Sequence, residues 1–354
     1  MEILINIISF ILLIGILVFI HELGHFLAAK SIGLRVEKFY IGFNLFGLGL
    51  KKKFGETEFG IGLFPIGGYV KVAGMIDESF DDNYKGEHDE YVSKNALQKV
   101  WFTSGGVIFN FILAFILFTG ITYFDGREVP LDTNVIGEVM PEHPASKAGL
   151  LPGDRIISID DINIESWLDI YDQISIKGNK TILVQYIRNN QTLETDILTN
   201  STLTPNGNTI GIIGITPEVE SLNPNLFQSI KYGFSDLISW LKIMTVSIFS
   251  LFTGQIGIEN FGGPVQIASL AGDASQKGLS IFLSFMAILS VNLGIINILP
   301  LPGLDGGHAL IAIIEGVLGR RIPFKVLMTI QQIGVLLLLI FFFIIMKNDI
   351  MRLF

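Results

Sequence analysis

The sequence of 354 residues contains no cysteine. This absence excludes disulfide bonds, thiolate metal ligands and a cysteine nucleophile. Charged residues are scarce too, at 16% against about a quarter in soluble domains. The chain has no basic patch that would suggest nucleic-acid binding and no Walker motif that would suggest an ATP-linked protease. These absences direct attention to the apolar residues, which make up half of the chain.

Long hydrophobic runs dominate the sequence. Three uncharged runs, 3–20, 107–124 and 326–346, can cross a bilayer, which takes about 20 residues. A fourth run, 279–299, is as apolar but includes Asn292 and Asn297. The N-terminus lacks the basic segment of a signal peptide, so we expect the first run to remain as an uncleaved helix. The sequence therefore predicts a polytopic α-helical membrane protein that sits in the lipid bilayer.

The distribution of charge predicts which segments face which side of the membrane. Residues 30–99 hold ten Lys/Arg, including three lysines at 51–53, and ten Asp/Glu. Residues 125–278 hold nine Lys/Arg against eighteen Asp/Glu, which accounts for the net charge of −9. The positive-inside rule places 30–99 in the cytoplasm, and 125–278 then face outward.

Three segments between the apolar runs differ in character. Residues 57–75 are rich in glycine around a proline, which favours a β-hairpin over a helix. Residues 130–220 predict a small soluble α/β domain, with strands at 155–159 and 181–187 and a helix around 166–175. Residues 226–252 carry an apolar stripe at steps of three and four, which suits an amphipathic helix better than a membrane span.

The first run ends in the pattern H-E-x-x-H. On a helix, His21 and His25 lie one turn apart on the same face and can reach one metal ion, while Glu22 can act on a metal-bound water. Ionisable groups at the end of an apolar helix are costly unless they bind something. We therefore expect one zinc ion with two histidine ligands and Glu22 as the catalytic base.

A third ligand has to come from elsewhere in the chain. Asp305 lies in N-I-L-P-L-P-G-L-D-G-G (297–307), whose prolines and glycines can hold irregular backbone at membrane depth, where it is tolerated only around a polar site. Asp305 could instead cap the helix that follows, and His308 is a weaker rival ligand. His88 and His143 are expected to be solvated surface residues.

The histidines and Asp305 can bind one metal ion only if they lie at the same depth in the membrane. His21 and His25 lie at the end of the first helix, and Asp305 follows the end of 279–299. They can meet only if both helices cross in the same direction, because opposite faces lie about 30 Å apart. This predicts four transmembrane helices, with 226–252 lying along the membrane or against the bundle.

Together these motifs resemble the site-2 protease family of intramembrane zinc metalloproteases. HELGH at the end of a first helix combines with N-x-x-P-x-P-x-L-D-G-G before the last. Residues 148–161, A-G-L-L-P-G-D-R-I-I-S-I-D-D, resemble a bacterial PDZ domain, 63–75 resemble the family's membrane-embedded hairpin, and 261–268 its Gly-Pro segment. The likeness runs nearly end to end and is to the bacterial regulator of sigma-E protease branch, with one PDZ domain. Val107 stands where many members carry proline.

The resemblance implies cleavage within or near transmembrane segments of single-pass membrane proteins, such as an anti-sigma factor or remnant signal peptides. It also implies a multi-pass protein of the bacterial cytoplasmic (inner) membrane, with the PDZ-like domain extracytoplasmic and the zinc site towards the cytoplasm. The hairpin offers a strand edge for substrate. Candidate substrate-binding or oxyanion residues are Asn297, Gly67, Gly68 and Tyr69.

The expected domains follow from these assignments. Residues 1–125 form a membrane region with the hairpin at 57–75, 126–222 the PDZ-like domain, 223–275 the amphipathic helix and Gly-Pro segment, and 276–354 the last two membrane helices. Two alternatives remain: a non-proteolytic membrane metal-binding protein, which would not need Glu22, and a PDZ scaffold, which would leave the histidines and Asp305 unexplained.

Overall fold

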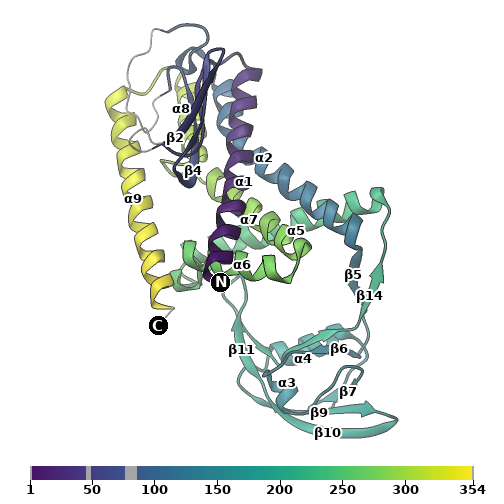
Figure 1. The fold of residues 1–354 in the computed structure, drawn as a ribbon. Helices are drawn as coiled ribbons and strands as arrows, with labels where there is room; N and C mark the ends of the chain where they lie inside the picture. The colour runs from purple at the N-terminus through teal and green to yellow at the C-terminus, as the bar shows by residue number, and fades with distance from the viewer. Residues whose placement is uncertain (1, 45–48, 76–85, 353–354) are drawn as a thin grey trace. The chain divides into compact units, whose positions relative to one another are not determined.

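The structure is a computed structural model, and it describes residues 2–44, 49–75 and 86–352 (Figure 1). The chain divides into two compact units. The first comprises Met1–Ile121, Ile230–Met244 and Ile258–Phe354, and the second comprises Thr122–Ser229 and Thr245–Gly257. Each unit is described by itself below.

The four expected membrane runs all lie in long helices. These are α1 (Glu2–Ser31), α2 (Ala96–Asp125), α7 (Leu279–Ile298) and α9 (Phe324–Met351). Three more helices are α5 (Leu226–Phe252), α6 (Pro264–Lys277) and α8 (Asp305–Leu318). Within the described residues, five helices are long and apolar enough to cross a membrane, namely α1, α2, α5, α7 and α9. Length and composition alone therefore leave the number of spans open.

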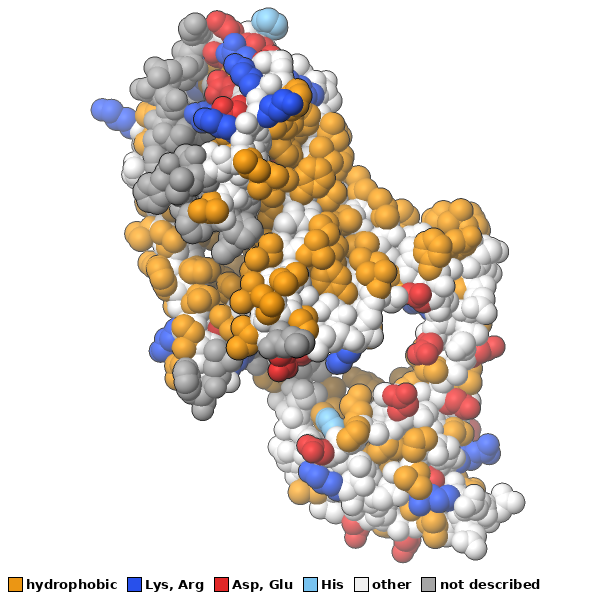
Figure 2. All heavy atoms as spheres, viewed as in Figure 1, with side chains coloured by type: hydrophobic (Ala, Val, Ile, Leu, Met, Phe, Trp, Pro, Cys, Tyr) orange, Lys and Arg blue, Asp and Glu red, His pale blue; other side chains and the backbone are white. Residues whose placement is uncertain are grey.

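Apolar side chains fill the interior of the first unit and also cover its outside. Leu13 and Leu17 of α1 are fully buried in one cluster with Phe282 and Met286 of α7. On the face seen in Figure 2, hydrophobic side chains cover the helices of this unit, and charged groups gather beyond the end of α1. An apolar exterior between charged ends is what a bilayer requires of its helices.

The helices α1 and α7 run in the same direction. Leu13 packs with Phe282 at the beginning of α7, while His21, farther along α1, shares a cavity with Asn297 at the end of α7. Helix α2 runs the opposite way, because His21 contacts its Asn110 and His25 contacts the earlier Phe102. Because α1 and α7 run in the same direction, the histidines and Asp305 lie at the same end of these two helices, as the sequence argument required.

Contacts of α5 and α6 favour a four-span arrangement. Gly233, near the start of α5, packs so closely on Thr119 in the last turns of α2 that an added Cβ would lie 2.2 Å from its Oγ1. The following helix α6 packs on the first turns of α1, where the hydroxyl of Ser9 donates to that of Ser275 over 2.9 Å. Because α1 and α2 are antiparallel, both contacts lie at the same end of the bundle. The span count stays a prediction.

A four-stranded sheet lies in the first unit, and its topology corrects the hairpin prediction. Its strands are β1 (Val36–Phe43), β2 (Gly49–Phe54), β3 (Thr57–Gly62) and β4 (Phe64–Val72), in the order β2-β3-β1-β4. β1 pairs in parallel with β3 and antiparallel with β4. The β-hairpin predicted for 57–75 is therefore wrong, because β1 lies between its two strands.

The short connections explain this pairing. One residue, Leu63, separates β3 from β4, which is too few for a two-residue hairpin turn. β3 instead makes a tight antiparallel hairpin with β2, and Gly55 in its turn has a φ of +59° that favours glycine. The predicted turn around Pro65–Gly68 lies inside β4.

The two edges of the sheet have different surroundings. Every residue of β2 is exposed, including the three lysines at 51–53. β4, at the other edge, packs on α1. A Cβ added at Gly68 would lie 2.7 Å from Cγ1 of Val18 and 3.0 Å from Cγ of Glu22. Among the described strands, β4 pairs with β1 alone.

The second unit is a small α/β structure. Its main sheet has the order β10-β9-β7-β8, with β7 at Arg155–Ile159, β8 at Ile162–Asn163, β9 at Thr181–Arg188 and β10 at Gln191–Leu198. Helices α3 (Pro144–Lys147) and α4 (Trp167–Ser175) accompany it, and Ser166 begins α4 with a capping box. Three two-stranded pairs complete the unit: β5 (Arg127–Pro130) with β14 (Val219–Leu222), β6 (Ile136–Val139) with β13 (Ile215–Pro217), and β11 (Asn200–Leu203) with β12 (Thr209–Ile212). The strands expected at 155–159 and 181–187 and the helix around 166–175 are therefore present.

The topology prediction can be tested with single cysteines, since the chain has none of its own. Cysteine at exposed Lys53 should be labelled from the cytoplasm by a membrane-impermeant thiol reagent, and cysteine at Ser201 from outside. Cysteines at Asn223 and Thr253, which flank α5, should both be labelled from outside. If Asn223 and Thr253 react from opposite sides, α5 crosses the membrane and the four-span prediction is wrong.

Candidate metal centre

Helix α1 brings His21 and His25 to one point. The four-residue spacing places both imidazoles on one face, one turn apart, with ring centroids 4.8 Å apart and nearly perpendicular. His25 and the intervening Glu22 are both buried, each 7% exposed. The His21 side chain is 12% exposed, so this turn of α1 is largely shielded and opens on one side to a cavity.

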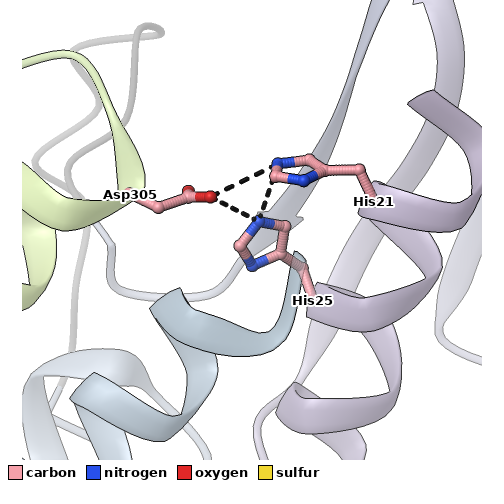
Figure 3. A group of neighbouring side chains, drawn as sticks. All are labelled: His21, His25 and Asp305. Atoms are coloured by element: carbon pink, nitrogen blue, oxygen red, sulfur yellow. Dashed lines mark hydrogen bonds and ion pairs between the residues drawn. The ribbon is translucent and has the colours of Figure 1, made fainter. Parts of the chain in front are cut away.

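Asp305 is the first residue of α8, and it lies next to both histidines. Gly306 and Gly307 let α8 begin against the loop that ends α7, because a Cβ at either would lie 2.2 Å from a backbone oxygen, that of Ile298 or Leu301. No larger residue fits there without moving the backbone. Figure 3 shows the Asp305 carboxylate pointing from α8 towards both imidazoles of α1.

The distances between the three side chains fit a zinc ion. Asp305 Oδ2 lies 3.3 Å from His21 Nε2 and 3.2 Å from His25 Nε2, and the two Nε2 atoms are 3.2 Å apart. Two ligands at about 2.0–2.1 Å from one zinc ion, at tetrahedral angles, lie about 3.3–3.4 Å apart. Two imidazoles and one carboxylate are also a usual donor set for catalytic zinc, with a fourth position left for water.

Backbone geometry orients the His25 ring. Its Nδ1–H donates to the carbonyl oxygen of Phe102 on α2 over 3.0 Å. The proton on Nδ1 leaves the lone pair of Nε2 free and pointed at the centre. Such a bond from the far nitrogen is how proteins fix the tautomer of a metal-binding histidine.

Asn110 lies beside the far nitrogen of the His21 ring. Its amide lies 3.1 Å from His21 Nδ1, and the residue is completely buried. Asn110 Oδ1 is buried with no hydrogen-bond partner among the described residues, while Nδ2 faces the ring. Turning the amide over so that Oδ1 faces the ring would let Oδ1 accept from Nδ1–H. His21 Nε2 then has the free lone pair that a metal needs.

Gly106 makes room for both rings. A Cβ there would lie 2.4 Å from His25 Nε2 and 2.5 Å from His21 Cε1. Sequence reasoning missed both Gly106 and Asn110 as parts of this site. A signal was present, since Asn110 is a buried polar residue in an otherwise apolar run, one turn after Gly106.

A cavity of about 230 Å³ adjoins the centre and collects most of the predicted residues. Its lining includes His21, Glu22 and His25 with Asp305, and also Asn297, Gly68 and Tyr69 from the predicted substrate-binding set. Gly67, the fourth member of that set, has a φ of +81° in β4 and is not among the described lining residues. The structure thus brings Glu22, Asn297 and the edge strand β4 to the metal centre.

The rival ligand His308 lines the same cavity but does not join the converging ligand atoms. It lies one turn after Asp305, and its Nε2 is 3.4 Å from the amide nitrogen of Gln331 on α9. Among the described residues, His21, His25 and Asp305 form the group whose ligand atoms converge, and His308 is not in it. His88 is exposed, and His143 belongs to the second unit.

Comparison with known proteins gives matches along almost the whole chain. Residues 9–341 match the model of peptidase family M50. The zinc metalloprotease RasP of Geobacillus kaustophilus is 31% identical, over 99% of this chain and 98% of that protein. The zinc metalloprotease RasP of Bacillus licheniformis is 29% identical, over 99% of each. These relatives support an enzyme over the metal-binding or scaffold alternatives.

One solved structure matches only part of the chain. The PDZ domain of the SdrC-like protein of Listeria monocytogenes aligns with 26% of this chain and 93% of that one, at 25% identity and a TM-score of 0.21. A TM-score this low does not establish a shared fold, so the PDZ-like fold of 126–222 stays a prediction.

The first prediction for this centre concerns zinc content. His21→Ala, His25→Ala and Asp305→Asn should each lower the zinc bound per purified protein, because each removes one of three ligands. Glu22→Gln should keep near-stoichiometric zinc, because Glu22 is expected to act as a base, and His308→Ala is the matched histidine control. Elemental analysis of the purified variants measures this. Full zinc retention by Asp305→Asn together with loss in His308→Ala would move the third ligand to His308.

The second prediction concerns Asn110. Asn110→Leu keeps the branched shape of the side chain but removes the polar group that faces His21 Nδ1, and it should weaken zinc binding by about 10- to 100-fold. Asn110→Asp keeps an acceptor and should retain most of the affinity. Competition with a zinc chelator measures both. Equal affinities for the two variants would show that the amide does not orient the ring.

Proposed function

Because this chain belongs to peptidase family M50, the site-2 proteases, and is a zinc metalloprotease, we propose that it cleaves peptide bonds within or next to transmembrane segments of other membrane proteins. One observation carries the proposal. The three converging ligand atoms come from α1 and α8, inside an apolar helical unit, and an edge strand borders the same cavity. A protease for soluble segments would need a solvent-facing site.

Each residue of the centre has a chemical task in this proposal. His21, His25 and Asp305 would hold zinc, which when bound polarises a carbonyl and lowers the pKa of a bound water. Glu22 would accept a proton from the attacking water on its carboxylate and later deliver it to the leaving amine. Asn297 would donate from its amide to the developing oxyanion or to the substrate backbone.

The strand β4 would hold the substrate extended. A helical peptide has its backbone groups already hydrogen-bonded and shielded, so it must unwind before attack, and its freed amides need partners inside lipid. β4 is an edge strand, and Gly68 and Tyr69 line the cavity beside Glu22. Addition of the substrate as a further strand would satisfy those amides and present one peptide bond to the centre.

The setting of the reaction follows from the same observations. The protein is a bacterial inner-membrane protein, as its apolar helices and its relatives indicate. We place the metal centre towards the cytoplasm and residues 126–222 outside, on the distribution of lysine and arginine. We propose single-pass membrane proteins as substrates, of the kind that the family resemblance implies: an anti-sigma factor or a remnant signal peptide. The outer domain would act as a filter against substrates with bulky outer parts.

Proteolysis in a reconstituted membrane tests the proposal. Wild-type protein in liposomes with a single-pass reporter should release a fragment cut within or next to the transmembrane segment. Glu22→Gln should lose cleavage by 100-fold or more, an effect of about the size expected for loss of a general base. Gly68→Ala should also slow cleavage with zinc retained, because the added methyl pushes β4 away from Val18 and Glu22.

Gly15→Ala is the matched control for the glycine variant, because a Cβ at Gly15 on α1 meets nothing within 4 Å. It should cleave like wild type. Cleavage confined to soluble parts of the reporter would contradict the intramembrane proposal. Full activity of Gly68→Ala would separate β4 from substrate binding while leaving the zinc chemistry in place.

A further inference from the structure

A second cavity lies away from the metal centre, between the start of α2 and the far end of α8. It has a volume of about 250 Å³. One wall is formed by residues 92–94 with Ala96 and Lys99, and the other by the end of α8 with the following loop. The two walls meet closely, since a Cβ added at Gly316 would lie 2.6 Å from that of Ala96. The cavity therefore bridges two helices at one end of the bundle.

The side chains that line this cavity are mostly cationic. Four cationic side chains line it, Lys94, Lys99, Arg320 and Arg321, and Glu315 is the one acidic side chain among its lining residues. We call it the basic pocket. The carboxylate is already engaged, because Glu315 Oε2 pairs with Lys99 Nζ over 2.8 Å and Oε1 accepts from the backbone of Ile322. The remaining cations are left without a neutralising anion in the pocket.

The cations differ in how far they are engaged. Lys94 Nζ donates to the carbonyl of Gly33 over 3.1 Å, and Arg321 donates to the carbonyl of Val92 over 2.8 Å. Both partners are neutral and leave the charges uncompensated. Arg320 has no hydrogen bond or ion pair with any residue that the structure describes, and it is exposed. The pocket thus presents at least two guanidinium groups that can bind an anion.

Exposed apolar residues follow two of the lining residues, Ala96 and Gly316, in the sequence. Leu97, in the first turn of α2, is 82% exposed, and Val317, in the last turn of α8, is 83% exposed. Trp101, one turn after Leu97, is half exposed and donates its indole N–H to Ser31. A tryptophan with one polar contact and an exposed ring is typical of the membrane–water interface. Basic groups close to an exposed tryptophan and exposed apolar side chains are the features expected where headgroups and acyl chains meet.

We propose that the basic pocket binds the phosphate of an anionic phospholipid, with its acyl chains against Leu97 and Val317. Paired arginines match the oxygens of a phosphate better than single charges do, because each guanidinium can donate two parallel hydrogen bonds. Basic pockets between transmembrane helices are a known mode of headgroup recognition. A free phosphate offers the same oxygens but not the chains, so the exposed apolar rim favours the lipid.

Such a lipid would act on the position of α8. The basic pocket joins α2 to the end of α8, and the Lys99–Glu315 pair already ties these helices together inside it. The first residue of α8 is Asp305. A bound headgroup would neutralise the arginines that crowd the end of α8 and so stabilise the packing of this helix on α2.

The test measures lipid-dependent stability of the full-length protein in detergent. Dioleoylphosphatidylglycerol should raise the unfolding temperature of wild type, and native mass spectrometry should detect a retained lipid. Arg320→Gln/Arg321→Gln should lose this rise, with binding weakened about tenfold or more. Lys52→Gln/Lys53→Gln on exposed β2 removes the same charge elsewhere and should keep the rise.

Comparing each protein with and without lipid separates binding from any basal loss of stability. Arg320→Gln alone, whose side chain has no described partner, should also weaken binding. An equal rise in the arginine variant and the lysine control would overturn the proposal, as would an equal rise with phosphatidylcholine. An equal rise with inorganic phosphate would show that a free anion, and not a lipid, is the occupant.

Discussion

Two imidazoles and a carboxylate inside an apolar bundle must satisfy one another or a shared cation, because lipid offers them no hydrogen bonds. His21 and His25 meet Asp305 at distances that match the edges of a zinc tetrahedron. Much of the first unit serves this convergence. α1 and α7 must run the same way for α8 to begin beside the histidines, and α2 must run against them to supply the groups that orient both rings.

Glycine is what lets these backbones come close enough. The backbones of α1 and α2 touch where Gly24 faces Gly105, with a Cβ at Gly24 falling 2.2 Å from the carbonyl oxygen of Gly105. Gly106 lies against the imidazoles, and Gly306 lets α8 begin on the end of α7. In a membrane, small residues at crossings replace the hydrophobic driving force with close packing. The metal site therefore depends on glycines that leave room for close packing as well as on the three ligand side chains.

The local parts of the site could be predicted from sequence, and the parts that depend on distant pairing could not. The four-residue spacing of His21 and His25 places them on one face of any helix, and the prolines and glycines of 297–307 indicated Asp305 as the third ligand. The direction argument then gave four spans. The position of β1 between β3 and β4 depends on pairing between distant segments, and no local pattern at 57–75 reveals it. Asn110 was missed because its role depends on its contact with His21 where α2 packs on α1, and the sequence does not show how these two helices pack.

The two edge strands of the described sheet differ in charge. β2 carries three consecutive lysines, which put positive charge on both of its faces and disfavour pairing with another copy of the same strand. β4, at the opposite edge, has no such run and lies in the cavity of the metal centre. If substrate adds to the sheet as proposed, the lysines of β2 disfavour that edge, and a strand added at β4 would lie near Glu22.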